Sequence, residues 1–196
     1  MNNQDKVFEF VKSRVTQTRF EHSKRVAQIA VKLAKKYGFD ENKAFLSGML
    51  HDICRELSTD RLLDLAKQYK IDVDQYEKDW PLGLHGKIAA KELATSFALD
   101  KEVEEAIKFH VTGYPKMGNI ARILYLADKI EEGRNYLGVE KIRLLAFDDY
   151  NKALLEAIDN SLLYLIERHL PIHPDTLAFR NELLLEENKK IHKNWS

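Results

Sequence analysis

The chain has 196 residues, and with 44% hydrophobic and 32% charged residues its composition is that of a soluble globular protein rather than a disordered one. Lysine plus arginine and aspartate plus glutamate each number 31, so no net charge favours binding to nucleic acid or to an anionic membrane. A single cysteine, Cys54, excludes an intrachain disulfide, and no apolar run resembles a signal peptide or a membrane span. We therefore expect one cytoplasmic domain with a sizeable core.

Apolar residues recur at helical spacing along most of the chain, and no alternation typical of strands extends over a useful length. In chain order, the expected helices cover residues 5–17, 18–37, 41–57, 59–69, 85–97, 101–111, 119–132, 139–146 and 148–169, with a last one beginning near Pro174. The pattern predicts an all-α protein.

Local residue types indicate where several of these helices begin and end. Thr18 and Glu21 are spaced as a capping box, and Gly38 is a typical helix stop. Asp40 and Asp100 stand where their side chains can cap the next helices. The helix boundaries are therefore expected to be set by neighbouring residues.

The predicted helices suggest a single helical domain. Its bundle covers residues 18–185, after an N-terminal helix within residues 1–17. Residues 71–84 are expected to form the longest irregular stretch, and residues 186–196 to form a charged tail.

Polar residues interrupt the apolar faces of five expected helices. A lone histidine on such a face is more often a satisfied core residue than a ligand. A carboxylate among buried apolar residues, as at Asp128, is costly unless it is paired or bound to metal. The interrupting residues are His22, His51, Asp52, His85, His110 and Asp128. Their occurrence on five helices indicates one shared polar centre.

The residue types of this centre suit a transition metal. Imidazole and carboxylate ligands without thiolate favour iron, manganese, zinc, cobalt or nickel over an iron–sulfur cluster. The ligands would come from separate helices, because no local motif such as HExxH is present. His85 and His110 are enough to complete a second metal position.

The order His22, then His51-Asp52, then Asp128 resembles the signature of the HD superfamily of phosphohydrolases. The chain is most similar to its YqeK branch, the bacterial symmetrical diadenosine tetraphosphate hydrolases. The matching stretches are HSKRVAQIAVKLAKKYG, AFLSGMLHDICREL, LHGKIAAKE, AIKFHVTGYPKMG, ILYLADKIEEGRNYLGVEKIR and PIHPDTLAFRN. They cover most of the chain and occur in the family's order, so the resemblance implies the HD helical bundle as the fold.

The resemblance also implies roles for individual residues. Metal ligation would fall to His22, His51, Asp52 and Asp128, with His85 and His110 facing a second metal or the phosphates. The catalytic residues would be Asp52, His85, His110 and Arg134. Nucleotide contacts would come from His22, Asp52, His85, His110, Val111, Thr112, Asp128, Arg134, Leu170, Pro171, Ile172, His173, Pro174, Asp175 and Thr176.

Two of these implied assignments have plainer alternatives. Arg134 follows Gly133 near a helix end, where it could fork onto a phosphate or be a solvated cation that favours a helix C-terminus. Segment 170–176 could line a nucleotide pocket or simply break one helix and cap the next.

By the same resemblance, a metal-bound hydroxide attacks the polyphosphate bridge of a dinucleoside tetraphosphate, and diadenosine tetraphosphate yields two ADP. Iron is the metal expected first, in a mono- or binuclear centre. The partners would be this nucleotide substrate and its ADP product, and a homodimer is compatible with the prediction. Binding to nucleic acid or to a membrane is not expected. One rival is an HD enzyme acting on deoxynucleotides, nucleoside monophosphates or guanosine tetraphosphate. The other is a sensor that binds metal and nucleotide with little turnover.

Overall fold

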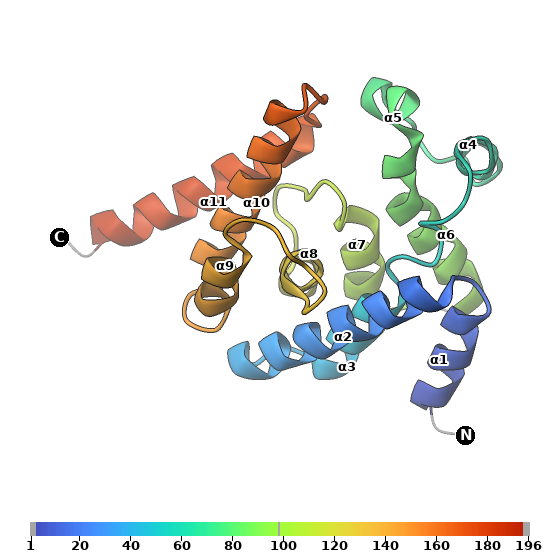
Figure 1. The fold of residues 1–196 in the computed structure, drawn as a ribbon, viewed down its shortest axis with the longest axis horizontal. Coiled ribbons are helices and arrows are strands. Elements are labelled where there is room, and N and C mark those ends of the chain that lie inside the picture. The colour runs from blue at the N-terminus through green and yellow to red at the C-terminus, as the bar shows by residue number, and fades with distance from the viewer. Residues whose placement is uncertain (1–2, 98, 194–196) are drawn as a thin grey trace.

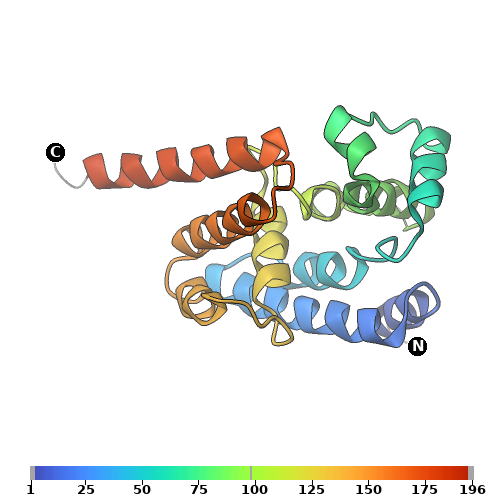
Figure 2. The same ribbon diagram turned by 45° about the horizontal axis from the view of Figure 1, so that its top comes forward.

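Helix α8 (Asn119–Ile130) lies at the centre of the fold in the computed structural model, which describes residues 3–97 and 99–193. Every residue from Ile120 to Asp128 is buried. Figure 1 shows α8 between α7 on one side and α9 and α10 on the other, and Figure 2 shows it crossing α2. The other helices are α1 (Asn3–Lys12), α2 (Gln17–Tyr37), α3 (Glu41–Leu50), α4 (Thr59–Gln68), α5 (Gln75–Asp79), α6 (His85–Phe97), α7 (Lys101–Phe109), α9 (Val139–Ala146), α10 (Tyr150–Glu167) and α11 (Pro174–Lys193), with a 3-10 turn, η1, at Pro81–Leu84. The described residues contain no strand, so the all-α prediction is confirmed.

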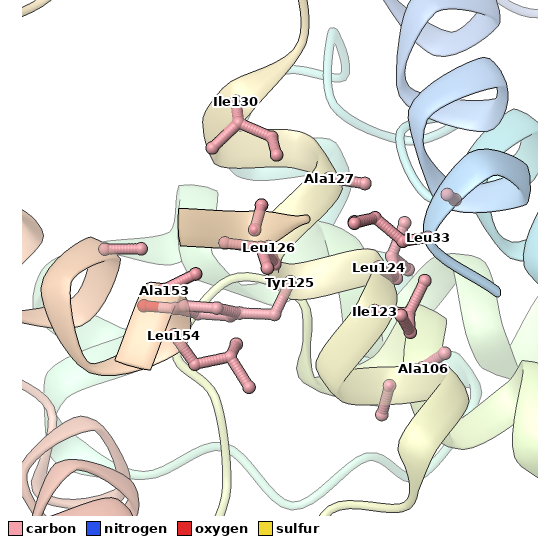
Figure 3. Packing of buried hydrophobic residues seen from close by; sticks show 14 of the residues in the cluster. Leu33, Ala106, Ile123, Leu124, Tyr125, Leu126, Ala127, Ile130, Ala153 and Leu154 are labelled. Carbon is pink, nitrogen blue, oxygen red and sulfur yellow. The ribbon is translucent and has the colours of Figure 1, made fainter. Parts of the chain in front are cut away.

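Two apolar clusters hold these helices together. The first surrounds α8, where Tyr125 points toward Ala153 and Leu154 of α10 (Figure 3). The ring of Tyr125 also meets Phe179 edge-on, with centroids 5.7 Å apart, and this contact brings α11 onto α8. The second cluster joins α1, α3, α4, α6 and α7. Helix α2 contributes to both clusters and so joins them: Leu33 lies in the first and Phe20 in the second.

The close approach of α2 and α3 depends on Gly48. A Cβ atom at this position would lie 2.5 Å from the Cα and 2.8 Å from the backbone N of Ala27. These are backbone atoms of the facing helix and cannot rotate away. The missing side chain at Gly48 thus lets α3 pack directly on α2, which places the end of α3 beside the second turn of α2.

Several predicted caps are present. Gly38 ends α2 in the left-handed region with φ 73°, and Asp40 and Asp100 each accept a backbone hydrogen bond at the start of a helix. These caps use residues next to the helix, and for that reason local sequence was enough to predict them.

The capping box at Thr18 is wrong. The N-cap of α2 is Thr16, two residues earlier, and its hydroxyl accepts the hydrogen bond from Arg19 N at 3.3 Å. The N–H and hydroxyl of Thr16 donate to the Glu56 carboxylate at 2.8 and 2.7 Å. A residue 40 positions away thus takes the role that the prediction gave to Glu21. Accordingly α1 ends at Lys12, short of the predicted residue 17.

The predicted helix to Leu57 stops at Leu50. Beyond it the chain makes tighter turns, with hydrogen bonds from Arg55 N to Asp52 O and from Leu57 N to Cys54 O. Residues 71–84 are more regular than predicted, because Asp74 and Glu77 form a capping box that begins α5. The chain therefore changes direction at His51 and Asp52, which directly follow α3.

Helix α11 continues through the segment predicted as a tail, as far as Lys193. Its side chains Glu182 and Glu186 bind the buried guanidinium of Arg122 on α8, with N–O distances of 2.8 Å. In both views the C-terminal part of α11 projects beyond the other helices (Figure 1, Figure 2). Within residues 3–97 and 99–193, every helix is too short or too polar to cross a lipid bilayer.

Candidate metal centre

Six polar side chains from five parts of the chain meet beside α8. His22 comes from the second turn of α2, and His51 and Asp52 directly follow α3. The remaining three are the first residue of α6, the residue after α7 and a residue in the last turn of α8: His85, His110 and Asp128. Each of the six is at most 7% exposed. The structure therefore brings together all the residues that interrupt the apolar faces.

Asp52 lies between two groups of histidines. Its Oδ2 is 3.3 Å from His51 Nε2 and 3.5 Å from His22 Nε2. Its Oδ1 is 3.1 Å from His85 Nε2 and 3.6 Å from His110 Nε2. One carboxylate thus serves two clusters that each have the size of a metal site.

Asp128 closes the first of these clusters. Its Oδ1 lies 3.2 Å from His22 Nε2 and 4.0 Å from His51 Nε2. Burial by itself raises the pKa of the Asp128 carboxyl, but Lys129, His22 and Arg134 outweigh it and hold that pKa well below its ordinary range. Both aspartates carry a negative charge at neutral pH, because the pKa of Asp52 is likewise held low by its histidines against the effect of burial.

The orientation of three imidazole rings is fixed by the backbone. The Nδ1 atoms of His51, His85 and His110 lie 2.8, 2.6 and 2.7 Å from the carbonyl oxygens of Gly48, Leu82 and Ile107. A carbonyl oxygen can only accept, so each Nδ1 carries the proton and donates it. The Nε2 atoms consequently face the aspartates, with either a proton or a metal ion between them.

The donor set fits a metal. The Nε2 atoms of His22 and His51 are buried and have no hydrogen-bond partner among the described residues. The Nε2 atoms of His85 and His110 lie 3.0 Å apart, and burial lowers the pKa of both rings, which makes the neutral forms favourable. Neutral rings in this arrangement point two lone pairs at each other, and a shared cation would remove the repulsion.

Glu131 is a site residue that sequence reasoning missed. It is 2% exposed, and its Oε1 accepts from His22 Nδ1 at 3.2 Å. Burial raises the pKa of the Glu131 carboxyl, but contacts with His22, Arg25 and the backbone N–H of Gly133 lower it to about 2. An anionic partner on Nδ1 fixes the His22 ring and increases its basicity as a ligand. The available signal was its position three residues after Asp128, on the same helix face.

Cations surround the carboxylates on their outer side. Arg19 Nη1 lies 2.9 Å from Asp52 Oδ2, and Lys129 Nζ lies 2.8 Å from Asp128 Oδ2. Arg134 Nη2 lies 2.5 Å from Asp128 Oδ1 while its Nε donates to the Asp128 carbonyl oxygen at 2.7 Å. The Arg134 side chain is 37% exposed. It therefore stands between solvent and the buried centre, not on a distant surface.

Segment 170–176 lies beside the loop that follows His110. Thr176 is buried, and its hydroxyl donates to the Thr112 carbonyl oxygen at 2.9 Å. His173 Nε2 lies 2.7 Å from Asp74 Oδ2, so the segment also reaches the start of α5. Val111 is partly buried beside Thr112. Leu170, Pro171 and Pro174 are exposed, and Ile172 and Asp175 are partly buried. The predicted nucleotide residues outside the centre thus lie in two segments, 111–112 and 170–176, which the contact of Thr176 with Thr112 joins.

The HD domain family model matches residues 19–133 of the chain. A protein of Halalkalibacterium halodurans named bis(5'-nucleosyl)-tetraphosphatase, symmetrical, is 37% identical over 94% of this chain and 99% of its own length. A Staphylococcus aureus protein of the same name is 32% identical over 91% and 93%. A crystal structure from Clostridium acetobutylicum, described as a predicted HD superfamily hydrolase involved in NAD metabolism, superposes with a TM-score of 0.89. It is 32% identical and covers 95% of this chain and 99% of that one.

Proposed function

This chain belongs to the HD domain family, and from that premise we propose that it is a metal-dependent hydrolase that cleaves diadenosine tetraphosphate symmetrically into two ADP in the cytoplasm. The observation that carries the proposal is the position of Asp52, whose two oxygens each face a different pair of buried histidines. The symmetrical tetraphosphatase names of relatives that match nearly the whole chain support the choice of substrate.

The proposed ligands of a first metal are His22, His51, Asp52 and Asp128. His85 and His110, with the other oxygen of Asp52, complete a second position or contact the phosphates. A bound first-row transition metal supplies Lewis acidity, which lowers the pKa of coordinated water and offsets charge on phosphoryl oxygens. Iron is the metal we expect first, from the family resemblance.

The protein's own residues hold the reacting groups in place. The carbonyl oxygens bound by His51, His85 and His110 keep each Nε2 directed at the centre. Arg134 is proposed to bind the polyphosphate, since metal at Asp128 would compensate the carboxylate that the guanidinium now contacts. A planar guanidinium can donate two parallel hydrogen bonds to a phosphate, and fixed positive charge is the main requirement of phosphoryl transfer.

The nucleoside part of the substrate is proposed to lie on Val111, Thr112 and segment 170–176. The hydrogen bond from Thr176 to the Thr112 carbonyl ties this surface to the loop that starts at His110. Adenosine bound there would have its phosphates directed toward the metal centre. The substrate chemistry and the metal chemistry are thus assigned to adjoining parts of the fold.

Product analysis tests the proposal. Purified protein is incubated with diadenosine tetraphosphate in parallel with Fe²⁺, Mn²⁺, Co²⁺, Ni²⁺ or Zn²⁺, and the nucleotides are resolved over time. ADP as the single product is the expected result. Equal amounts of ATP and AMP would refute symmetrical cleavage. Deoxynucleoside triphosphates, nucleoside monophosphates and guanosine tetraphosphate serve as competing substrates. Faster turnover of any of them would favour another HD phosphohydrolase, and binding of ADP without turnover would favour a sensor.

A further inference from the structure

Two residues that act on the metal centre lie beyond the end of α8. Glu131 caps the helix and binds His22, and Arg134 follows three residues later and binds Asp128. The last carbonyl groups of a helix have no partners within it and need others. Within the turn, Arg134 N donates to the Glu131 carbonyl oxygen at 2.9 Å. The carbonyl groups of Ile130 and Arg134 need partners outside the turn if both side chains are to stay on the centre.

Arg143, on the following helix α9, supplies these partners. Its Nε donates to the Ile130 carbonyl oxygen at 2.9 Å. Its Nη2 donates to the carbonyl oxygens of Glu131 at 2.7 Å and Arg134 at 2.8 Å. A single guanidinium thus holds the carbonyl groups on both sides of the turn, and its remaining Nη1 pairs with Glu140 at the surface.

We propose that Arg143 is a positioning residue of the metal centre. By fixing the backbone of the 131–134 turn, it keeps Glu131 on His22 and Arg134 on Asp128. It acts through these residues and touches neither the metal ligands nor the substrate. The role at Arg134 rests on the proposed function, because it concerns phosphate binding. The role at Glu131 concerns only the His22 ligand and stands independently.

The geometry argues against a role in packing alone. Helix α9 already buries Val139, Ile142 and Ala146, and this apolar face attaches it to α8 and α10. The Arg143 side chain is 24% exposed, and its Nε and Nη2 both donate to carbonyl oxygens of the turn. A guanidinium can span three carbonyl oxygens because its donors are arranged in a rigid planar fork, whereas a lysine ammonium is a point charge on a flexible stem.

Arg143→Ala and Arg143→Lys test the inference, with two controls from the same helix. Glu140→Gln removes the ion pair but leaves the carbonyl contacts, and Lys141→Ala removes a surface cation that pairs with Glu156. Mn²⁺ affinity is measured by competition with a chromophoric chelator, and ADP affinity on the Mn²⁺-loaded protein by calorimetry. All measurements are made well below the melting temperature, where circular dichroism verifies the fold.

We expect Arg143→Ala to weaken both Mn²⁺ and ADP binding by about tenfold to a hundredfold, the usual effect of losing an outer support of a metal site. Arg143→Lys should recover part of each loss, and both controls should stay within about twofold of the wild type. A lower melting temperature with unchanged Mn²⁺ and ADP affinities would reduce Arg143 to a structural residue and overturn the proposal.

A double mutant separates the action of Arg143 through Arg134 from its action through Glu131. If Arg143→Ala does not fold, Arg143→Lys takes its place in this test. Combined with Arg134→Ala, the Arg143 variant should weaken ADP binding by less than the product of the single effects, since both act through one contact. Multiplicative effects would refute the action through Arg134. If the wild type binds Mn²⁺ but neither ADP nor diadenosine tetraphosphate, the proposed function fails, and the Mn²⁺ affinities alone still decide whether Arg143 supports the His22 ligand.

Discussion

The Nε2 atoms of His85 and His110 lie 3.0 Å apart, while each ring directs its Nδ1 at a carbonyl oxygen three residues earlier in the chain. The Nδ1 protons are thereby committed to the backbone. Two buried neutral rings would then oppose their lone pairs, and Asp52 Oδ1 lies close to both. This arrangement is the main structural argument for a second cation position.

Metal analysis should therefore find up to two first-row transition metal ions per chain. In the double variant His85→Ala/His110→Ala we expect about one ion to remain, because the first cluster keeps all of its ligands. Elemental analysis after gentle purification measures the ratio. The control is His169→Asn, which changes an exposed histidine with φ 54° to a residue that tolerates this conformation. A double variant with the metal content of the wild type would contradict the second position.

Asp52→Asn should remove most of the metal and lower kcat/KM by at least about a hundredfold, since metal binding contributes several kcal/mol to transition-state stabilisation. The amide keeps the shape of the side chain but loses the charge that faces both histidine clusters. Elemental analysis and steady-state kinetics measure the two effects. Asp100→Asn is the control, because this exposed residue caps α7 and asparagine caps equally well. Normal turnover in Asp52→Asn would refute its assignment as a shared ligand.

Arg134→Ala should lower kcat/KM by roughly a hundredfold or more, through the loss of a charge-assisted phosphate contact. Arg134→Lys should recover only part of the lost kcat/KM, because an ammonium lacks the bidentate geometry of a guanidinium. The metal content of both variants is expected to stay normal, which separates phosphate binding from ligation. Arg168→Ala, at an exposed arginine after α10, is the matched control. An unchanged kcat/KM in Arg134→Ala would leave the residue with its contact to Asp128 and no role in substrate binding.

Gly48→Ala should destabilise the fold by about 1–3 kcal/mol, the usual cost of overpacking a core. The added Cβ would collide with backbone atoms of Ala27, so α3 must move away from α2. Because the Gly48 carbonyl oxygen also orients His51, metal affinity should fall with stability. Urea unfolding and metal titration measure both. In the control Gly83→Ala, the new Cβ meets only the ring of Trp80, which is 52% exposed and can shift. Equal stability of the two variants would contradict this account of the α2–α3 contact.

Sequence periodicity alone determined that the protein is helical, and buried polar positions alone indicated a shared centre. Both features are local: a helix repeats every 3.6 residues, and a histidine or aspartate on an apolar stripe must face inward wherever the helix packs. The caps at Asp40 and Asp100 were likewise predictable, since each side chain binds a backbone N–H two residues later.

Only the tertiary structure decided how these groups are paired. Glu56 caps α2 from 40 residues away, and Glu131 binds His22 across 109 positions. The two oxygens of Asp52 are divided between histidines from four different segments. Such contacts depend on the angles at which α2, α3 and α7 pack on α8 and at which α6 packs on α7. Those angles follow from side-chain packing over the whole core, and no short stretch of sequence encodes them.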